Sequence, residues 1–399
     1  MIPRAWRYAW HNSADRRIVR AHGWADTAVT ARPGITYSTA SAAGDDPLVL
    51  AYAGLTDGLS HVLPFLEERR GTEGRRLRRR VRWAELTAAR PTAAADLLAV
   101  GAGRDRLTAH TVTPLRHSLL LPFRINLTVP VPPDAKDVLP GVSRKARQQH
   151  AREVRSRSRT LEVVSSDADL VSFYHRMHLP TMRSRHGGAA RSVDLGTARR
   201  CLFRQGVLFH LCEQGTPVAG MLCRLEGDVL VLRLAGVLDG SGSPYRSGTY
   251  MSLYIMIIEW AARNGITHVD LSGCEPFLSK GIFQFKRKLH PEVGIPGNHF
   301  AGKRLLLRVL QDRPVVRDFL VANPLLALDA RDRLEAVYFH DRERPPRLDL
   351  RWECPGIAGH RLEDLDSFLA GLPTGPATTR ASSADPARHL TASDRKGGL

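Results

Sequence analysis

Three proton-accepting side chains lie close together near the middle of the chain. His268 and Asp270 are two residues apart in a β-type run, so they face the same side of a strand. Glu275 follows in the next loop. Each of the three could act as a general base that takes a proton from a substrate, directly or through water. Asp270 could equally serve only to fix a neighbouring turn.

A cationic cluster follows these candidate bases. Phe285 is succeeded by Lys286, Arg287 and Lys288. Arginine and lysine side chains gathered in this way can bind phosphate oxygens. A lysine paired with a surface acid is the alternative interpretation of Lys286.

The elements that must position these residues can be read from periodicity. Apolar runs at 206–213, 218–225 and 229–237, separated by Gly-containing turns, predict an antiparallel meander. Residues 249–264 are apolar on most faces and predict a buried helix that ends before Gly265. A strand over 266–271 then carries His268 and Asp270.

A strongly basic helix is predicted upstream, over residues 143–159. Its thin apolar stripe repeats every four residues, and arginines surround it. The helix is either an exposed face without a ligand or a phosphate-binding surface. A helix pair broken at Pro180 follows; His175 and His178 lie three residues apart there, but spacing supplies no third ligand, so no metal site is predicted.

The flanking regions are less regular. We expect a strand at 47–55, a short helix at 60–70 and an arginine run at 75–86 that forms a solvated helix or loop, or contacts phosphate. A boundary between two halves is placed near residue 135. Residues 302–370 are predicted to form a helical appendage, and the Gly/Pro/Ser-rich segment 371–399 a disordered tail.

Composition limits the classes of function. The chain has 399 residues, enough for two domains, and a formal net charge of +18, which favours a polyanionic partner, although an arginine-rich genome is an alternative cause. The five cysteines form no C-x-x-C pair and are expected to be reduced thiols. No apolar run resembles a signal peptide or a membrane span, so a cytoplasmic protein is expected.

No G-x-S-x-G, Walker A, G-x-G-x-x-G or H-E-x-x-H motif is present. The order of meander, helix, strand and basic loop instead resembles the GNAT acyltransferase superfamily, in particular its FemAB-like and BioF2-like branch. The basic helix from Ser143, Gly220 in the meander, and the segment Asp270-LSGCEPFLSKGIFQFKRK carry the resemblance. It covers about 117–290.

The resemblance implies a fold and a domain plan. The expected class is α+β or α/β, with tandem GNAT-like domains whose mixed, mostly antiparallel sheets are flanked by helices. Residues 1–135 would be a degenerate N-terminal half and 136–301 the catalytic half. Two features depart from the family: the glycine-rich pyrophosphate loop is replaced by Tyr245-RSGTYM, and no long coiled-coil arm is present.

Site roles carried over from the family are as follows. Lys286 would stabilise the developing negative charge beside the candidate bases Asp270, Glu275 and His268. Residues expected to bind the acyl donor are Phe285, Arg287, Lys288, Tyr245, Arg246, Ser247, Gly248, Arg144, Lys145, Arg147, Arg152 and Arg155. Residues expected to bind the acceptor are Tyr174, Arg183 and Phe277.

The resemblance implies an acyltransferase that forms an amide. The favoured donor is aminoacyl-tRNA, used as a co-substrate without any further cofactor, because the positive charge suits tRNA and the pyrophosphate loop is poor in glycine. Acetyl-CoA is the alternative donor. The acceptor would present an amine on a small molecule, such as a natural-product intermediate, or on a peptide. A further alternative is a non-catalytic nucleic-acid-binding or membrane-surface protein.

Overall fold

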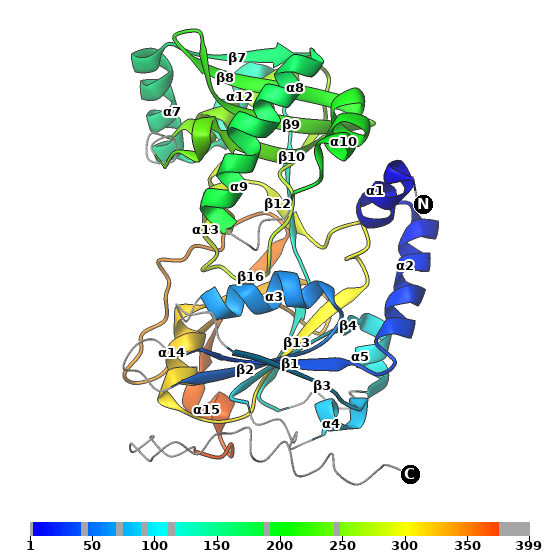
Figure 1. Cartoon of the computed structure of the whole chain (residues 1–399). Coiled ribbons are helices and arrows are strands. Elements are labelled where there is room, and N and C mark those ends of the chain that lie inside the picture. The colour runs from blue at the N-terminus through cyan, green and yellow to red at the C-terminus, as the bar shows by residue number, and fades with distance from the viewer. Residues whose placement is uncertain are drawn as a thin grey trace.

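The computed structural model describes residues 3–40, 47–68, 75–88, 95–110, 116–186, 192–242 and 248–374. These residues form two lobes, one above the other in Figure 1, with a helical hairpin along one side. Among the described helices, none combines the length and the apolar character that crossing a membrane requires.

The N-terminal lobe is built on a six-stranded sheet in the order β3-β1-β2-β4-β13-β5. Only β2 and β4 pair in parallel; the other pairs are antiparallel. The strands are β1 (Gly34–Ala40), β2 (Leu48–Gly54), β3 (Arg75–Arg80), β4 (Leu97–Gly103), β5 (Ser118–Pro122) and β13 (Lys303–Val309). The helices of this lobe are α3 (Asp57–Glu68), α4 (Trp83–Thr87), α5 (Arg104–His110), α14 (Pro314–Ala322) and α15 (Leu365–Leu369).

The C-terminal lobe holds a seven-stranded sheet in the order β12-β6-β11-β10-β9-β8-β7. Its strands are β6 (Asn126–Pro130), β7 (Arg159–Val164), β8 (Gly206–Glu213), β9 (Thr216–Glu226), β10 (Val229–Val237), β11 (His268–Asp270) and β12 (Glu292–Gly294). Its longer helical segments are α7 (Arg144–Arg157), α8 (Asp167–Phe173), the π-helical η2 (Tyr174–His178), α9 (Leu179–His186), α12 (Thr249–Arg263) and α13 (Gly281–Lys286). Short turns complete it: η1 (Ala135–Asp137), α6 (Val138–Gly141), α10 (Leu195–Thr197), η4 (Ala198–Leu202), η5 (Phe203–Gln205), η6 (Leu238–Gly240) and η7 (Arg287–Leu289).

The two faces of this second sheet are covered by different helices. Buried residues of α7, α12 and α13 pack together with one face, and those of α8, η2 and η4 with the other. The apolar helix α12 connects β10 to β11, which pair in parallel. A helical crossover of this kind is the usual connection between parallel strands.

The parallel pair β10–β11 separates after three residues. Val229, Leu230 and Val231 oppose His268, Val269 and Asp270, and β11 then ends while β10 continues to Val237. The pairing of β10 with β9 shifts register between Leu232 and Leu234, which indicates a bulge at the point of separation. The strands therefore open a gap in the sheet directly beyond Asp270.

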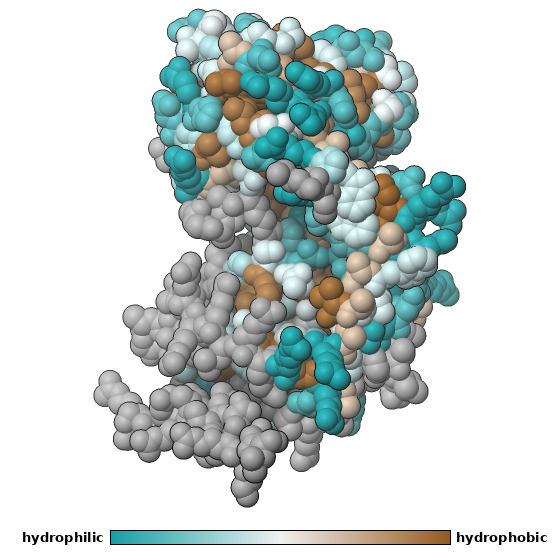
Figure 2. Space-filling model, turned by 45° about the vertical axis from the view of Figure 1, so that its right-hand side comes forward, coloured by the Kyte–Doolittle hydropathy of each residue, from teal (hydrophilic) through white to brown (hydrophobic). Residues whose placement is uncertain are grey.

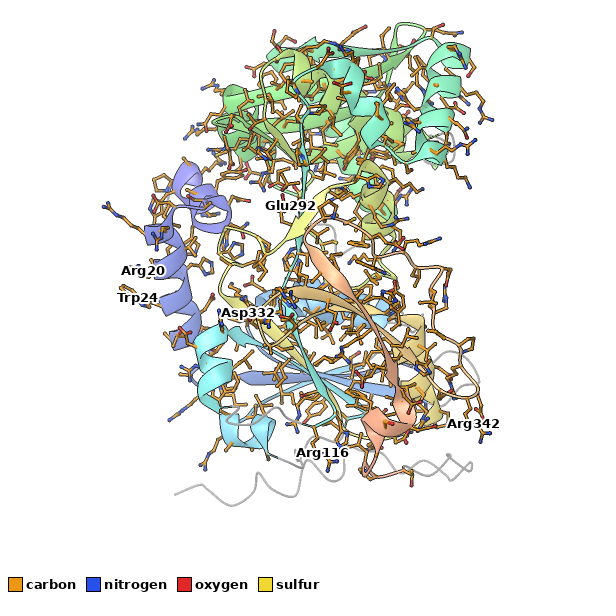
Figure 3. The ribbon with its side chains drawn as sticks, turned by 180° about the vertical axis from the view of Figure 1, so that it is seen from behind. Arg20, Trp24, Arg116, Glu292, Asp332 and Arg342 are labelled. Carbon is orange, nitrogen blue, oxygen red and sulfur yellow. The ribbon has the colours of Figure 1, made fainter. Side chains whose placement is uncertain are left out.

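The hairpin at the N-terminus consists of α1 (Arg4–Asn12) and α2 (Arg16–Val29). Asp15 caps α2, since its carboxylate accepts hydrogen bonds from the amides of Arg17 and Ile18. Tyr8 of α1 is buried with residues of the C-terminal lobe. On α2, Arg20 and Trp24 point away from the body (Figure 3), and Trp24 is 71% exposed. The hairpin was not predicted from the sequence.

A third, smaller sheet lies where the two lobes meet. It has the order β14-β15-β16, with β14 (Leu325–Leu328), β15 (Leu334–His340) and β16 (Ile357–Asp364). Alternate residues of β15 belong to different cores: Ala336 and Tyr338 pack with the C-terminal lobe, Val337 and Phe339 with the N-terminal lobe. This alternation follows from the two-residue period of a strand.

Several predictions are confirmed and others are wrong. The α+β class with mostly antiparallel mixed sheets is confirmed, as are the meander and the buried helix. The arginine run at 75–80 is an edge strand rather than a helix or loop, and 302–370 contains four strands rather than a helical appendage. The chain passes from the first sheet to the second at 123–125, ahead of the expected boundary at 135. Most of the segment predicted as a tail lies outside the described residues.

Candidate active site

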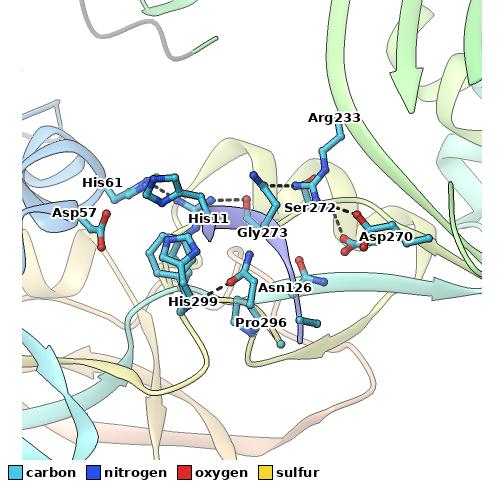
Figure 4. Close-up of a pocket in the computed structure, with 17 residues that line it drawn as sticks. His11, Asp57, His61, Asn126, Arg233, Asp270, Ser272, Gly273, Pro296 and His299 are labelled. Carbon is cyan, nitrogen blue, oxygen red and sulfur yellow. Dashed lines mark hydrogen bonds and ion pairs between the residues drawn. The ribbon is translucent and has the colours of Figure 1, made fainter. Parts of the chain in front are cut away.

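A cavity of about 390 Å³ lies between the two lobes (Figures 2 and 4). The loop after β11, the start of α3, the hairpin and the loop before β13 all contribute to its walls. The lining residues are His11, Asn12, Ala14, Asp57, His61, Arg124, Asn126, Glu226, Arg233, Asp270, Ser272, Gly273, Pro296, Gly297, Asn298, His299 and Phe300. Of the predicted catalytic residues, Asp270 borders this cavity.

Asp270 is placed by the end of β11. One carboxylate oxygen, Oδ1, accepts a hydrogen bond of 2.7 Å from the amide of Ser272. The described residues donate no hydrogen bond to its other oxygen. Arg233, on the neighbouring strand β10, borders the same cavity (Figure 4) and is oriented by Asn12 of the hairpin, which accepts its hydrogen bond at 3.1 Å. Asp270 can thus fix the turn, as one interpretation held, and still present an oxygen to a substrate.

The turn after Asp270 is held in an unusual conformation. Ser272 has a φ of 64°, in the left-handed region that costs a non-glycine residue roughly 1 kcal/mol or more. Its hydroxyl donates a 2.6 Å hydrogen bond to the carbonyl of Leu232, where β10 and β11 separate. At Gly273 a Cβ atom would come within 2.2 Å of the Ile125 carbonyl oxygen, so only glycine fits. These constraints fix the carbonyl of Ser272.

Lys286 reaches this turn from α13. Its side chain is buried, with the residue 4% exposed, and Nζ donates a 2.9 Å hydrogen bond to the Ser272 carbonyl. Burial lowers the pKa of Lys286 to about 8, and the nearby Cys274 thiol and Asp270 carboxylate oppose this shift. Lys286 is not part of the cavity wall; it lies behind Ser272. A buried ammonium group with a pKa close to neutral can release or take up a proton during a reaction.

Glu275 is surrounded by cations. Its carboxylate is 3.1 Å from Arg124 Nη1 and 3.5 Å from His61 Nδ1, and it forms a further ion pair with Lys280. Burial raises the pKa of Glu275, but the hydrogen bond with His61 and the charges of Arg124 and Lys280 outweigh it and hold the pKa well below its usual range. A carboxylate so strongly stabilised as an anion is a poor base. Glu275 therefore ties the turn to the N-terminal lobe.

The remaining groups near the turn are less suited to catalysis. His268 lies at the start of β11, outside the cavity wall, and its Nδ1 is 2.8 Å from the Thr267 hydroxyl. Burial raises the pKa of Cys274 to about 11, which leaves it a thiol and a weak nucleophile. The five cysteines are all buried and free.

Most of the residues predicted to bind the donor lie together on another face. Arg144, Lys145, Arg152 and Arg155 are exposed on α7, and Arg147 is half-buried and donates to the Leu139 carbonyl. The backbone amide of Ser143 donates a hydrogen bond to the carbonyl of Lys288, which joins the start of α7 to η7, the element that also contains Arg287. Phe285 packs edge-on against Tyr254 of α12.

The N-terminus of α12 adjoins this basic surface. Gly248 precedes the helix with a φ of 70°, and a Cβ atom there would come within 2.6 Å of the Gln149 side chain on α7. Tyr245, Arg246 and Ser247 lie outside the described residues. Arg159, which sequence reasoning missed, is fully buried and donates to the hydroxyls of Thr249 and Ser252 in the first turns of α12.

The structure does not gather the residues predicted to bind the acceptor. Phe277 is 1% exposed and packs against Phe65 in the core of the N-terminal lobe, so it has no surface to offer a ligand. Tyr174 is buried, and its hydroxyl donates to the Val193 carbonyl. Arg183 is exposed on α9. None of the three borders the cavity between the lobes.

Sequence reasoning missed the walls that come from the N-terminal lobe and the hairpin. His11, Asp57, His61 and Arg124 border the cavity but lie far from the Asp270 segment in the sequence. Two buried imidazole nitrogens at these walls have no hydrogen-bond partner among the described residues. They are His299 Nδ1 and His22 Nε2, and His22 lies behind His11. Leaving such an atom unpaired costs about 1–3 kcal/mol. In the sequence, the sign of these walls was limited to a single arginine, Arg124, close to the end of an expected strand.

Comparisons with known proteins agree with this architecture. Residues 143–287 match the family model described as an acetyltransferase (GNAT) domain. The matched residues, 143–287, include α7, the meander, α12, Asp270 and Lys286. No curated protein matches the sequence.

Solved structures are similar only at a distance. FemX is 12% identical, with 78% of this chain and 96% of that chain covered and a TM-score of 0.37. L-PGS from Bacillus licheniformis is 12% identical, with coverage of 77% and 96% and a TM-score of 0.34. A GCN5-related N-acetyltransferase from Sphaerobacter thermophilus is 14% identical, with coverage of 65% and 72% and a TM-score of 0.30. Values this low do not bear on substrate or mechanism.

The family match and the geometry of the second sheet thus agree. The parallel strands part beside a buried lysine, an aspartate borders the adjoining cavity, and the helix that links the two strands begins beside a basic surface. Residues 143–287 match a GNAT acetyltransferase domain, and the protein is an acyltransferase.

Proposed function

We propose that this acyltransferase moves an aminoacyl group from aminoacyl-tRNA to the amine of a small molecule or peptide. The observation that carries the proposal is the exposed basic surface of α7 beside the N-terminus of α12. Arg144, Lys145 and Arg155 form no ion pair with any described residue, so their charges are available to a polyanion. With a formal net charge of +18, the protein would attract tRNA strongly at low salt.

Donor and acceptor would approach the gap between β10 and β11 from different sides. Leu230, Leu232 and Val269 face the core that contains α7, α12 and α13, whereas Asp270 follows Val269 and faces the cavity. The aminoacyl end of tRNA would enter beside α12 and Lys286. The acceptor amine would enter through the cavity, near Asp270 and Arg233.

The reaction follows from these positions. The acceptor nitrogen attacks the ester carbonyl carbon, a C–N bond forms, and the carbonyl oxygen gains negative charge. Asp270 takes the proton lost by the amine. The C–O bond to the tRNA ribose then breaks, and the ribose oxygen needs a proton, which Lys286 is placed to give because its pKa of about 8 leaves it mainly protonated at neutral pH. No resident cofactor takes part.

Acetyl-CoA is a second candidate donor. The family model that matches 143–287 is described as an acetyltransferase domain, and the N-terminus of α12 could accept a pyrophosphate. The same residues would serve in that reaction, with a thiolate as leaving group. Because charged tRNA is a cytoplasmic reactant, the tRNA proposal implies a cytoplasmic enzyme.

Binding experiments separate the two donors. Purified protein should bind aminoacylated tRNA in a gel-shift titration, with affinity falling steeply between about 50 and 200 mM salt, as expected for multiple phosphate contacts. Acetyl-CoA should bind weakly in calorimetry under the same conditions. Tight binding of acetyl-CoA together with no binding of tRNA at low salt would overturn the proposal and favour the second donor.

A further inference from the structure

Three histidines from separate parts of the chain converge at the wall of the cavity between the lobes. His11 comes from α1, His22 from α2 and His299 from the loop between β12 and β13. One nitrogen from each ring can be chosen so that the three atoms lie within 4.8 Å of one another. His11 and His299 border the cavity (Figure 4), and His22 lies behind them on the inner side of α2.

The buried nitrogens of this cluster lack hydrogen-bond partners. His22 is 6% exposed and His299 is 9% exposed. His22 Nε2 and His299 Nδ1 are both buried, and neither forms a hydrogen bond with any described residue. Packing of the rings against each other, with centroids 4.7 Å apart for His22 and His299, leaves these two lone-pair positions unused. A simple histidine stack does not account for them.

A carboxylate lies behind His22, an arrangement that is common for histidines that bind a metal. His22 Nδ1 lies 3.2 Å from Asp26 Oδ2, one helical turn along α2. With a proton on Nδ1 shared with that carboxylate, the lone pair of His22 is on Nε2, the atom without a partner. Metal-bound histidines commonly have this arrangement, which fixes the ring and its tautomer.

The charges beside the cluster are mixed, with two carboxylates and one ammonium group. The ammonium group of Lys303 is buried between Asp26 and Asp57, at 3.0 and 2.6 Å, so one positive charge meets two negative charges. The three groups together carry a net charge of about −1 beside three imidazoles that are neutral when they bind a metal. Asp57 itself borders the cavity next to His11 and His299.

We propose that His11, His22 and His299 bind a divalent first-row transition metal ion, for which Zn²⁺ is the reference. Three imidazole ligands suit zinc and its neighbours, and a site with three protein ligands leaves a position for water or a substrate atom. Two nitrogens bound to tetrahedral zinc lie about 3.4 Å apart, whereas the three nitrogens here lie within 4.8 Å of one another. The side chains would therefore move toward one another by on the order of 1 Å. Exposed His11 can make most of that adjustment by rotation.

The proposed ion would join the hairpin to the loop before β13. His11 and His22 belong to the hairpin, and His299 belongs to a loop that follows the catalytic domain. Since Asn12 and Ala14 also border the cavity, the ion would fix one wall of it. The open coordination position would face the cavity. This inference stands independently of the identity of the acyl donor.

Metal binding can be measured directly on the full-length chain without an affinity tag. After treatment with a chelator, the protein is titrated with Zn²⁺ by calorimetry and with Co²⁺ by visible absorption. We expect one ion per chain and an intense Co²⁺ spectrum typical of a four-coordinate site. Failure of the untagged wild-type protein to bind either ion stoichiometrically would overturn the proposal.

Substitutions then assign the ligands. His11→Ala should weaken Zn²⁺ binding at least tenfold, and Asp26→Asn about 10–100-fold. His175→Ala is the matched control. His175 is exposed on η2 of the C-terminal lobe and does not border the cavity, so its loss should leave Zn²⁺ affinity unchanged. Because His11 is exposed, its variant should unfold at the wild-type temperature in chelator. Equal Zn²⁺ affinity in His11→Ala and wild type would contradict the assignment; His299→Ala provides an independent repeat.

Discussion

Positive charge is held in opposite ways at the α7 surface and at the turn after β11. On α7, Arg144, Lys145 and Arg155 are exposed and form no ion pair with a described residue. At the turn, Arg124 and Lys280 are paired with buried Glu275, and Lys286 is buried against a carbonyl. The first arrangement attracts a polyanion over a distance, whereas the second fixes atoms at a reaction centre. Substitutions in the two regions should therefore fail in different ways.

The largest effect is expected at the cavity face of the turn. Asp270→Asn removes the proposed base but keeps the hydrogen-bond acceptor that the Ser272 amide uses. We expect kcat to fall about 10²–10⁴-fold, with donor affinity unchanged. Steady-state kinetics with a fixed acceptor provide the measurement. A fall of less than threefold would remove Asp270 from the chemistry.

Lys286→Met should lower kcat by about 10²–10³-fold, which lies within the range for loss of the general acid that protonates the leaving oxygen. In the wild type the rate should fall as the pH rises through about 8, because the charged form of Lys286 is lost there. The matched control is Lys288→Met, since Lys288 is exposed two residues away. Equal losses of kcat in both variants would make Lys286 a donor-binding residue.

The same substitution should stabilise the fold. The unfolded chain keeps the Lys286 proton up to its ordinary pKa of 10.5, whereas the folded chain loses it above about 8. Stability therefore rises with pH between these values, and below about 8 the buried charge is a constant cost. Lys286→Met should raise the free energy of unfolding at pH 7 by about 1–3 kcal/mol, measured by urea denaturation. A lower stability would contradict this account.

Glu275→Gln tests the other side of the turn. Loss of the carboxylate charge leaves the half-buried Arg124 and Lys280 without their counter-charge, so we expect a destabilisation of up to about 3 kcal/mol at pH 7. Because the folded pKa of Glu275 is lowered, its stabilisation is present above its ordinary pKa of 4.5 and is lost as the pH falls below that value. Urea denaturation at pH 7 and pH 4 should show a smaller difference in the variant than in wild type.

The smallest effect is expected on α7. Arg144→Gln/Arg155→Gln should reduce the slope of log affinity against log salt for tRNA by roughly 1.5–2, with kcat at saturating tRNA unchanged. Arg116→Gln/Arg342→Gln, on the far end of the N-terminal lobe (Figure 3), removes the same charge as a control. If both double variants change the slope equally, α7 has no special place in tRNA binding.

The parts of the fold that were predictable are those fixed by local patterns. The meander alternates apolar residues between glycine-containing turns, and α12 is apolar on most faces, so neither depends on distant contacts for its type. The arginine run at 75–80 has no such pattern. It becomes strand β3 because its backbone pairs with β1 at a sheet edge, where charged residues are common.

The candidate site was predictable only along one continuous segment. Asp270, Glu275 and Lys286 lie within one stretch and do converge on the same turn. Two partners of Glu275, His61 and Arg124, lie more than 100 residues before it, and His299 lies more than 250 residues after His11 and His22. Their meeting depends on how the lobes and the hairpin pack, which no local period encodes. The pair His175 and His178 had helical spacing but no third partner.

Transfer of a labelled amino acid tests the central claim most directly. Charged tRNA carrying radiolabelled amino acids would be incubated with the enzyme and a pool of amines, with labelled acetyl-CoA in a parallel reaction, and the products identified by mass spectrometry. The account predicts a labelled amide from charged tRNA in the wild type and little or none with Lys286→Met. An amide formed only from acetyl-CoA would contradict it.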